Sequence, residues 1–164
     1  MDPNLTIRRA GAHDACDTAA LFSAALKSMA FFPKLHTDDE DLVFVQSFIA
    51  KDECWLAIEG DAIRGLACLE GDLLAHLYVH PDHRDRGIGS ALLDHVKRQR
   101  PEGFQLWTFQ ANGGAQRFYE RHGCAAEEFT DGSGNEEKLP DMRYVWRGAA
   151  PGRAETRYRG APRK

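Results

Sequence analysis

The chain of 164 residues has little cysteine, no long apolar run and no excess of basic residues. Its four cysteines stand far apart and form no Cys-x-x-Cys pair, which argues against a zinc site or a disulfide framework and predicts reduced side chains. No stretch approaches the roughly 20 apolar residues of a membrane span, and no basic segment followed by an apolar run opens the sequence. These absences predict a cytoplasmic protein with no metal and no membrane partner.

The charge is unevenly distributed along the chain. Residues 148–164 hold five basic residues and one acidic residue, so residues 1–147 carry −8 although the whole chain carries only −4. An acidic body binds polyanions poorly, which disfavours a nucleic-acid partner. The hydrophobic fraction of 43% suffices for one core. We therefore expect one domain over residues 4–147 and a flexible basic tail over residues 148–164.

Hydrophobic periodicity predicts a mixed α+β fold. Glycine turns at Gly60 and Gly71 join three successive strand candidates, which indicates antiparallel pairing. A helical segment that joins two later strands predicts a crossover, so the central sheet is expected to be mainly antiparallel and flanked by helices. Strands are expected at 5–9, 54–58, 63–69, 73–79, 104–109 and 142–146, and a loop is expected at 127–141. Helices are expected at 13–29, from Gly87, at 112–122, and after Thr37-Asp38-Asp39-Glu40, which has the form of a capping box.

The stretch 77–90, Leu-Tyr-Val-His-Pro-Asp-His-Arg-Asp-Arg-Gly-Ile-Gly-Ser, runs from a strand through a turn into a helix. Glycines at 87 and 89 remove side chains where a backbone must approach a ligand, and the first amides of a helix attract anions. Arg84 and Arg86 add positive charge that suits a pyrophosphate. Taken alone, the turn could also be a tight connection that binds nothing.

A longer pattern separates this turn from other phosphate-binding motifs. A dinucleotide fingerprint would need a third glycine where Leu92 stands, and a P-loop would need Gly-Lys-Ser/Thr; neither is present. The spacing Arg84-x-x-Gly87-x-Gly89, followed later by Asn112-x-x-Ala115-x-x-Phe118-Tyr119, resembles the GNAT superfamily of N-acetyltransferases. The resemblance covers residues 4–147 by element order. It implies acetyl-CoA as cosubstrate, a strand that splays from its neighbour at the cofactor site, and direct acetyl transfer to a primary amine in a ternary complex.

The resemblance also implies roles for individual residues. The strand residues Leu77, Tyr78 and Val79 are expected to pair with the pantetheine arm, and the Val79 N–H is a candidate donor to the oxyanion. Asn112 is expected to contact the cofactor, although it could simply cap its helix. Tyr119 is expected to protonate the departing thiolate, although its spacing also fits core packing. The amides expected to hold the pyrophosphate are those of Asp85, Arg86, Gly87, Ile88, Gly89 and Ser90.

The sequence leaves more than one source for the general base. An alkyl ammonium must lose a proton before it attacks, so a base or a water path is required. Relatives often place a carboxylate at the end of the strand before the asparagine helix, but residues 106–110 contain none. His76 is the next candidate, because histidine titrates near pH 6.5. The alternative is a hydrogen-bonded histidine within the sheet.

No motif specifies the acceptor. The acidic residues between 127 and 141 could attract a small cationic amine or could be a solvated loop. Phe31, Phe32, His36 and Trp55 could line an acceptor pocket or belong to the core. We expect an N-acetyltransferase for a small cationic amine; the alternatives are a protein or peptide amine acetyltransferase and a non-catalytic acyl-CoA sensor. Many GNAT relatives form dimers, so a homodimer stays open.

Overall fold

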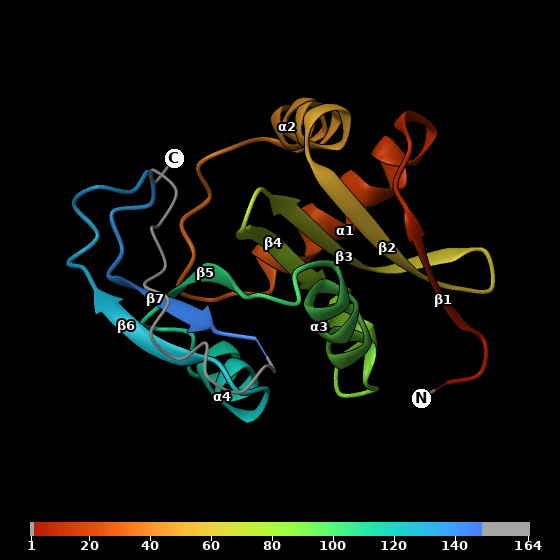
Figure 1. The fold of residues 1–164 in the computed structure, drawn as a ribbon. Coiled ribbons are helices and arrows are strands. Elements are labelled where there is room, and N and C mark those ends of the chain that lie inside the picture. Colours follow the sequence, from red (N-terminus) through yellow and green to blue (C-terminus); the bar gives the residue numbers. More distant parts are fainter. Residues whose placement is uncertain (1, 149–164) are drawn as a thin grey trace. The chain divides into compact units, whose positions relative to one another are not determined.

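The structure, a computed structural model, describes residues 2–148. All but the first residue of the predicted basic tail therefore lie outside the described residues. The chain divides into two compact units (Figure 1). The first consists of the residues up to Glu70 together with His76–Val96, and the second consists of Gly71–Ala75 with the chain from Lys97 onward.

Antiparallel strands build the first unit. β1 (Leu5–Arg9) pairs with β2 (Glu53–Glu59), which pairs with β3 (Ala62–Glu70). Gly60 connects β2 to β3 at φ 63°, a left-handed conformation that glycine adopts without steric cost. The strand order in this unit is β1-β2-β3-β4, where β4 (Leu73–Val79) contributes its residues from His76 onward. The predicted hairpin is confirmed.

Two helices cover one face of these strands. α1 (Ala15–Lys27) and α2 (Asp38–Lys51) bury Phe22 and Phe48 against Leu56 and Leu66 in one hydrophobic cluster. The predicted capping box is confirmed, because the Thr37 hydroxyl accepts from the Glu40 amide and the Glu40 carboxylate accepts from the Thr37 amide. This face of the sheet is therefore the core of the first unit.

The opposite face receives α3 (Ile88–Gln99), of which Ile88–Val96 belong to the first unit. A β-carbon at Gly65 of β3 would lie 2.7 Å from Leu92 Cδ1, so glycine permits close helix packing there. The Trp55 ring lies 4.2 Å from the His95 ring of α3. Because strand side chains alternate, Trp55 faces away from the α1 and α2 side.

The second unit contains β5 (Phe104–Phe109), α4 (Gly113–Arg121), β6 (Ala125–Phe129) and β7 (Asp141–Trp146). Its strand order is β4-β5-β7-β6, in which β4 and β5 are parallel at Leu73 opposite Gln105 and the other pairs are antiparallel. The parallel pair confirms the crossover. The predicted α+β class, with a mixed, mainly antiparallel sheet and flanking helices, is confirmed as well. The splay of β4 beyond this pair stays an expectation.

The loop predicted for 127–141 is wrong at its start, because β6 extends to Phe129. β6 is an edge strand with mostly exposed side chains, and a register shift interrupts its pairing with β7 between Ala126 and Glu128. Charged residues are common on edge strands, where they discourage pairing with another chain. The Glu-Glu sequence here therefore looked like a loop by composition.

The predicted reduced state of all four cysteines is also wrong. Cys54 of β2 lies directly opposite Cys68 of β3, with the Cα atoms 4.2 Å apart, and the two form a buried disulfide. Cys16 is an exposed thiol and Cys124 a buried one. Spacing along the sequence did not reveal the pair, because strand register brings the two residues together.

Candidate active site

The turn from β4 into α3 has the backbone of an anion site. Asp85 and Gly87 adopt left-handed conformations, at φ 62° and φ 82°. A β-carbon on Gly87 would meet no atom within 4 Å, so the backbone angle, and not the available space, calls for glycine there. The Ala91 amide donates to Gly87 O at 3.0 Å, so the amides of Ile88 and Gly89 precede the first hydrogen bond of α3. Such amides attract anions.

Two exposed arginines flank these amides. The Arg84 guanidinium donates to the Ser28 hydroxyl at 2.9 Å, and Ser28 in turn donates to Ala25 O at the end of α1. Arg86 donates to His83 Nδ1 at 3.2 Å. Each guanidinium is therefore held beside the turn by a neutral partner, which a phosphate oxygen could replace with a stronger, charge-assisted hydrogen bond.

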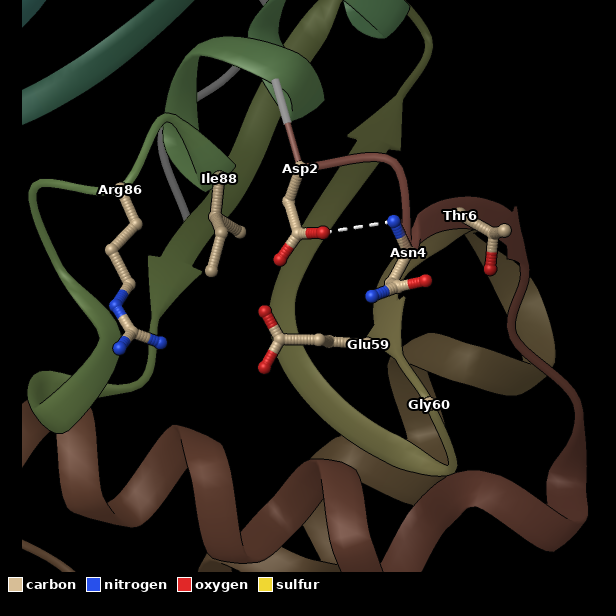
Figure 2. Close-up of a pocket in the computed structure, with 7 residues that line it drawn as sticks. All are labelled: Asp2, Asn4, Thr6, Glu59, Gly60, Arg86 and Ile88. Atoms are coloured by element: carbon tan, nitrogen blue, oxygen red, sulfur yellow. Dashed lines mark hydrogen bonds between the residues drawn. The ribbon is translucent and has the colours of Figure 1, made fainter.

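A cavity of about 660 Å³ lies next to the turn in the same unit, and Figure 2 shows the residues that line it. Asp2 Oδ1 accepts from the Asn4 amide at 2.8 Å, and Glu59 lies 3.5 Å from Arg64 Nε. The lining therefore combines the carboxylates of Asp2 and Glu59 with the guanidinium of Arg86. Sequence reasoning missed this cavity, because its lining comes from three separate parts of the chain: the start of the chain, the end of β2 and the start of α3. The lining residues are Asp2, Asn4, Thr6, Glu59, Gly60, Arg86 and Ile88.

His76 lies on β4 among aromatic rings of α1 and α2. Its ring centroid is 4.6 Å from Phe48, 5.6 Å from Phe44 and 5.9 Å from Phe22. Tyr78, two residues further along β4, packs edge-on against Phe22 at 5.4 Å. Phe44 is 49% exposed, so this aromatic cluster reaches the surface of the unit. His76 therefore packs among aromatic rings in this unit, and its role as a base stays a prediction.

In the second unit, Asn112 caps α4. Its Oδ1 accepts from the Ala115 amide at 3.0 Å, so the capping role considered from the sequence is confirmed. Gln110, directly after β5, donates its side-chain amide to the backbone oxygens of Thr130 and Asp141. The Gln110 side chain therefore links the end of β5 to the start of β7, and this position carries no carboxylate.

Tyr119 is buried on α4, with its ring centroid 5.2 Å from Phe118 and 6.0 Å from Tyr144. The Tyr144 hydroxyl donates to Glu120 Oε1 at 3.1 Å. Burial and this hydrogen bond to Glu120 raise the pKa of Tyr144 to about 12. Tyr119 therefore packs against a second tyrosine that stays protonated at neutral pH.

The acidic residues around β6 and β7 are not an open cluster. Glu127 pairs with Arg147, and Glu128 lies 3.8 Å from Arg143. Asp141 is 4% exposed and accepts hydrogen bonds from the side chains of Thr130 and Asn135. Three of the acids counted in the sequence thus have structural partners. Within residues 2–148, no three His, Cys, Asp or Glu side chains are grouped to hold a metal ion, and no helix is long and apolar enough to span a membrane.

Comparison with known proteins agrees with this geometry. A family model described as an acetyltransferase (GNAT) domain matches residues 50–123. The peptidyl-lysine N-acetyltransferase YiaC of Escherichia coli (strain K12) is 32% identical over 106 residues, which cover 61% of this chain and 67% of that protein. The chain belongs to the GNAT family of N-acetyltransferases. The predicted resemblance is confirmed.

Other GNAT proteins match to different extents. The uncharacterized N-acetyltransferase MJ1207 of Methanocaldococcus jannaschii is 31% identical over 106 residues, which cover 62% of this chain but only 47% of that protein. The peptidyl-lysine N-acetyltransferase YjaB of Escherichia coli is 27% identical over 146 residues, covering 86% of this chain and 97% of YjaB. The solved apo form of YjaB has the same fold, with a TM-score of 0.73 and 23% identity over 88% of this chain and 99% of that chain.

Proposed function

We propose that this GNAT protein transfers the acetyl group of acetyl-CoA to a primary amine by direct attack in a ternary complex. The observation that carries the proposal is the turn from β4 into α3, with left-handed Gly87 and two exposed arginines beside the first helical amides. The amides from Asp85 to Ser90 hold the pyrophosphate, and the backbone of Leu77, Tyr78 and Val79 pairs with the pantetheine arm. Asn112 contacts the cofactor in addition to capping α4.

The chemistry needs one hydrogen-bond donor and two proton transfers. The amine nitrogen attacks the thioester carbonyl, so a C–N bond forms and the C–S bond breaks. The Val79 N–H stabilises the oxyanion. Tyr119 donates its proton to the departing thiolate, and His76 or a water path accepts the proton that the amine loses. The position of Tyr119, seven residues after Asn112 on α4, supports its role by resemblance to the family pattern.

A peptidyl-lysine side chain is the first candidate acceptor, because YiaC and YjaB are both named as peptidyl-lysine N-acetyltransferases. A small cationic amine is the second candidate. The acidic segment was the main argument for this candidate. The argument is weaker in the structure, because Glu127 and Glu128 lie beside arginines and Asp141 is buried. A non-catalytic acyl-CoA sensor is the third. A cytoplasmic location and a homodimer stay predictions.

An assay for free CoA thiol tests the activity and the role of Tyr119 together. The protein is incubated with acetyl-CoA and either a lysine peptide or a polyamine. We expect thiol release with the peptide, and a kcat for Tyr119→Phe that is lower by roughly 10²-fold, at the low end for general acid catalysis. The KM for acetyl-CoA should change little, because the interaction belongs to the transition state.

Tyr144→Phe is the matched control, because it deletes the neighbouring hydroxyl and should leave kcat unchanged. Wild-type kcat in folded Tyr119→Phe, with chemistry rate-limiting, would contradict the proton-donor role. Acetyl-CoA binding without thiol release for any amine would favour the sensor. The same kinetics test His76: a base there gives kcat/KM an acidic limb that disappears in His76→Gln, whereas a persisting limb leaves His76 as packing.

A further inference from the structure

Two histidines of the turn, His80 and His83, have no part in the family motif or in the proposed mechanism. His83 ends a short 3₁₀ turn (Pro81–His83), and its amide donates to His80 O at 2.9 Å. The two rings lie 5.4 Å apart, and His83 is half-buried. Arg86, which also lines the cavity in Figure 2, contacts His83 directly.

The contact between Arg86 and His83 determines where His83 carries its proton. A guanidinium has only donors, so His83 Nδ1 must accept the hydrogen bond of 3.2 Å from Arg86 Nη1. An imidazolium carries a proton on both ring nitrogens. Protonation of His83 and this hydrogen bond therefore exclude each other.

The charges around His83 also favour its neutral form. Desolvation, followed by the nearby charges of Arg64 on β3, Arg86 and His80, lowers the pKa of His83, and Glu59 on β2 acts in the opposite direction. Asp82 faces His80, with 4.0 Å between Asp82 Oδ2 and His80 Nδ1. An anion bound at the turn would compensate the excess of positive charge.

We propose that His83 takes up a proton when the pyrophosphate of acetyl-CoA binds at the turn. Arg86 leaves His83 Nδ1 for a phosphate oxygen, and Nδ1 then accepts a proton from the buffer. The two phosphate charges stabilise the imidazolium that results. The inference rests on the proposed function, because it requires the pyrophosphate at this turn.

The proposal gives the pH dependence of binding a definite sign. Affinity rises as the pH falls through the interval between the pKa of His83 in the free protein, which lies below 6.5, and its higher pKa in the complex. Above this interval His83 is neutral in both states, and below it His83 is charged in both. The dependence is therefore confined to this interval.

Titration calorimetry in buffers of different ionisation enthalpy measures the number of protons exchanged. The probe is acetyl-CoA without its 3′-phosphate, because a phosphate monoester has a pKa of about 6 and would itself titrate. Within this pH interval we expect the wild-type protein to take up a fraction of a proton per bound ligand. The uptake should fall to nearly zero in His83→Gln.

His80→Gln is the matched control. His80 Nδ1 accepts from the backbone amide of Asp82 at 3.2 Å, a donor that a phosphate does not need to displace, so this variant should keep the uptake. If His83→Gln does not fold, NMR titration of the wild-type His83 ring should show a higher pKa with the probe bound than without it.

Three outcomes would overturn the proposal: binding without proton uptake, unchanged uptake in His83→Gln, or an uptake that only His80→Gln removes. Equilibrium dialysis separates these outcomes from a failure of the proposed function. A protein that does not retain the probe in dialysis contradicts acetyl-CoA binding itself.

Discussion

Gly87 and Gly71 share a left-handed backbone, at φ 82° and φ 60°, and an added β-carbon meets no atom within 4 Å at either position. Alanine should therefore cost each site about 1 kcal/mol of backbone strain and little else. Only Gly87 lies in the turn before α3. The two glycines form a matched pair that separates folding from binding.

We expect Gly87→Ala and Gly71→Ala to lower the free energy of unfolding by similar amounts, measured by denaturant titration. Only Gly87→Ala should weaken acetyl-CoA binding, by roughly tenfold if the strain distorts the amides that hold the pyrophosphate. Calorimetry with acetyl-CoA checks this result. Equal affinities in the two folded variants would contradict a role for the turn in binding.

At the scale of elements, the segment between β6 and β7 depends on one buried carboxylate. Asp141 accepts from Thr130 Oγ1 and from Asn135 Nδ2, and Asn135 Oδ1 accepts from the Leu139 amide at 3.2 Å. These hydrogen bonds hold the segment against the start of β7. Removing the charge of Asp141 should therefore lower the stability of the fold more than it affects binding of the amine substrate.

Asp141→Asn replaces one of the two acceptor oxygens with an NH₂ donor, so either Thr130 or Asn135 loses the oxygen to which it donates. Because this donor is buried, the substitution should lower the free energy of unfolding by about 1–3 kcal/mol. Glu136→Gln, on the exposed part of the same segment, should change it by less than about 0.5 kcal/mol. Urea denaturation compares the two variants. If both lose the same stability, the Asp141 contacts are not what holds the segment.

At the scale of the whole molecule, the four cysteines are in three states. Cys54 and Cys68 form a disulfide, Cys16 is an exposed thiol and Cys124 is a buried thiol. Burial raises the pKa of Cys124 to about 11, so only about one thiol in 10³ is ionised at pH 8. We expect Cys16 to react quickly with a thiol reagent in the folded protein and Cys124 to react slowly.

Unfolding without a reductant should expose only the thiols of Cys16 and Cys124, and reduction should add those of Cys54 and Cys68. Counting thiols before and after reduction checks this expectation. Four thiols in the unfolded chain before reduction would show that Cys54 and Cys68 are reduced, as the sequence predicted.

The sequence predicted the local features of this chain well. The capping box at Thr37, the strand 104–109 and the helix that follows Gly87 all depend on neighbours within a few residues. The family pattern around Gly87 and Asn112 is local as well. These features need no knowledge of strand register.

Long-range contacts account for what the sequence did not predict. The disulfide depends on Cys54 facing Cys68 across two strands, and the cavity in Figure 2 is lined by three separate parts of the chain. β6 was missed because an edge strand tolerates a charged composition. The contact between Arg86 and His83 is local, but only the side-chain geometry shows which nitrogen accepts the hydrogen bond.

The disulfide between β2 and β3 also acts on the chain before it folds. It joins residues 14 positions apart, so an unfolded chain that keeps the bond carries a closed loop and has fewer conformations to lose. On the chain-entropy account, a loop of this length is worth about 3 kcal/mol. Reduction would thus leave the ladder between β2 and β3 in place and lower stability mainly by enlarging the unfolded ensemble.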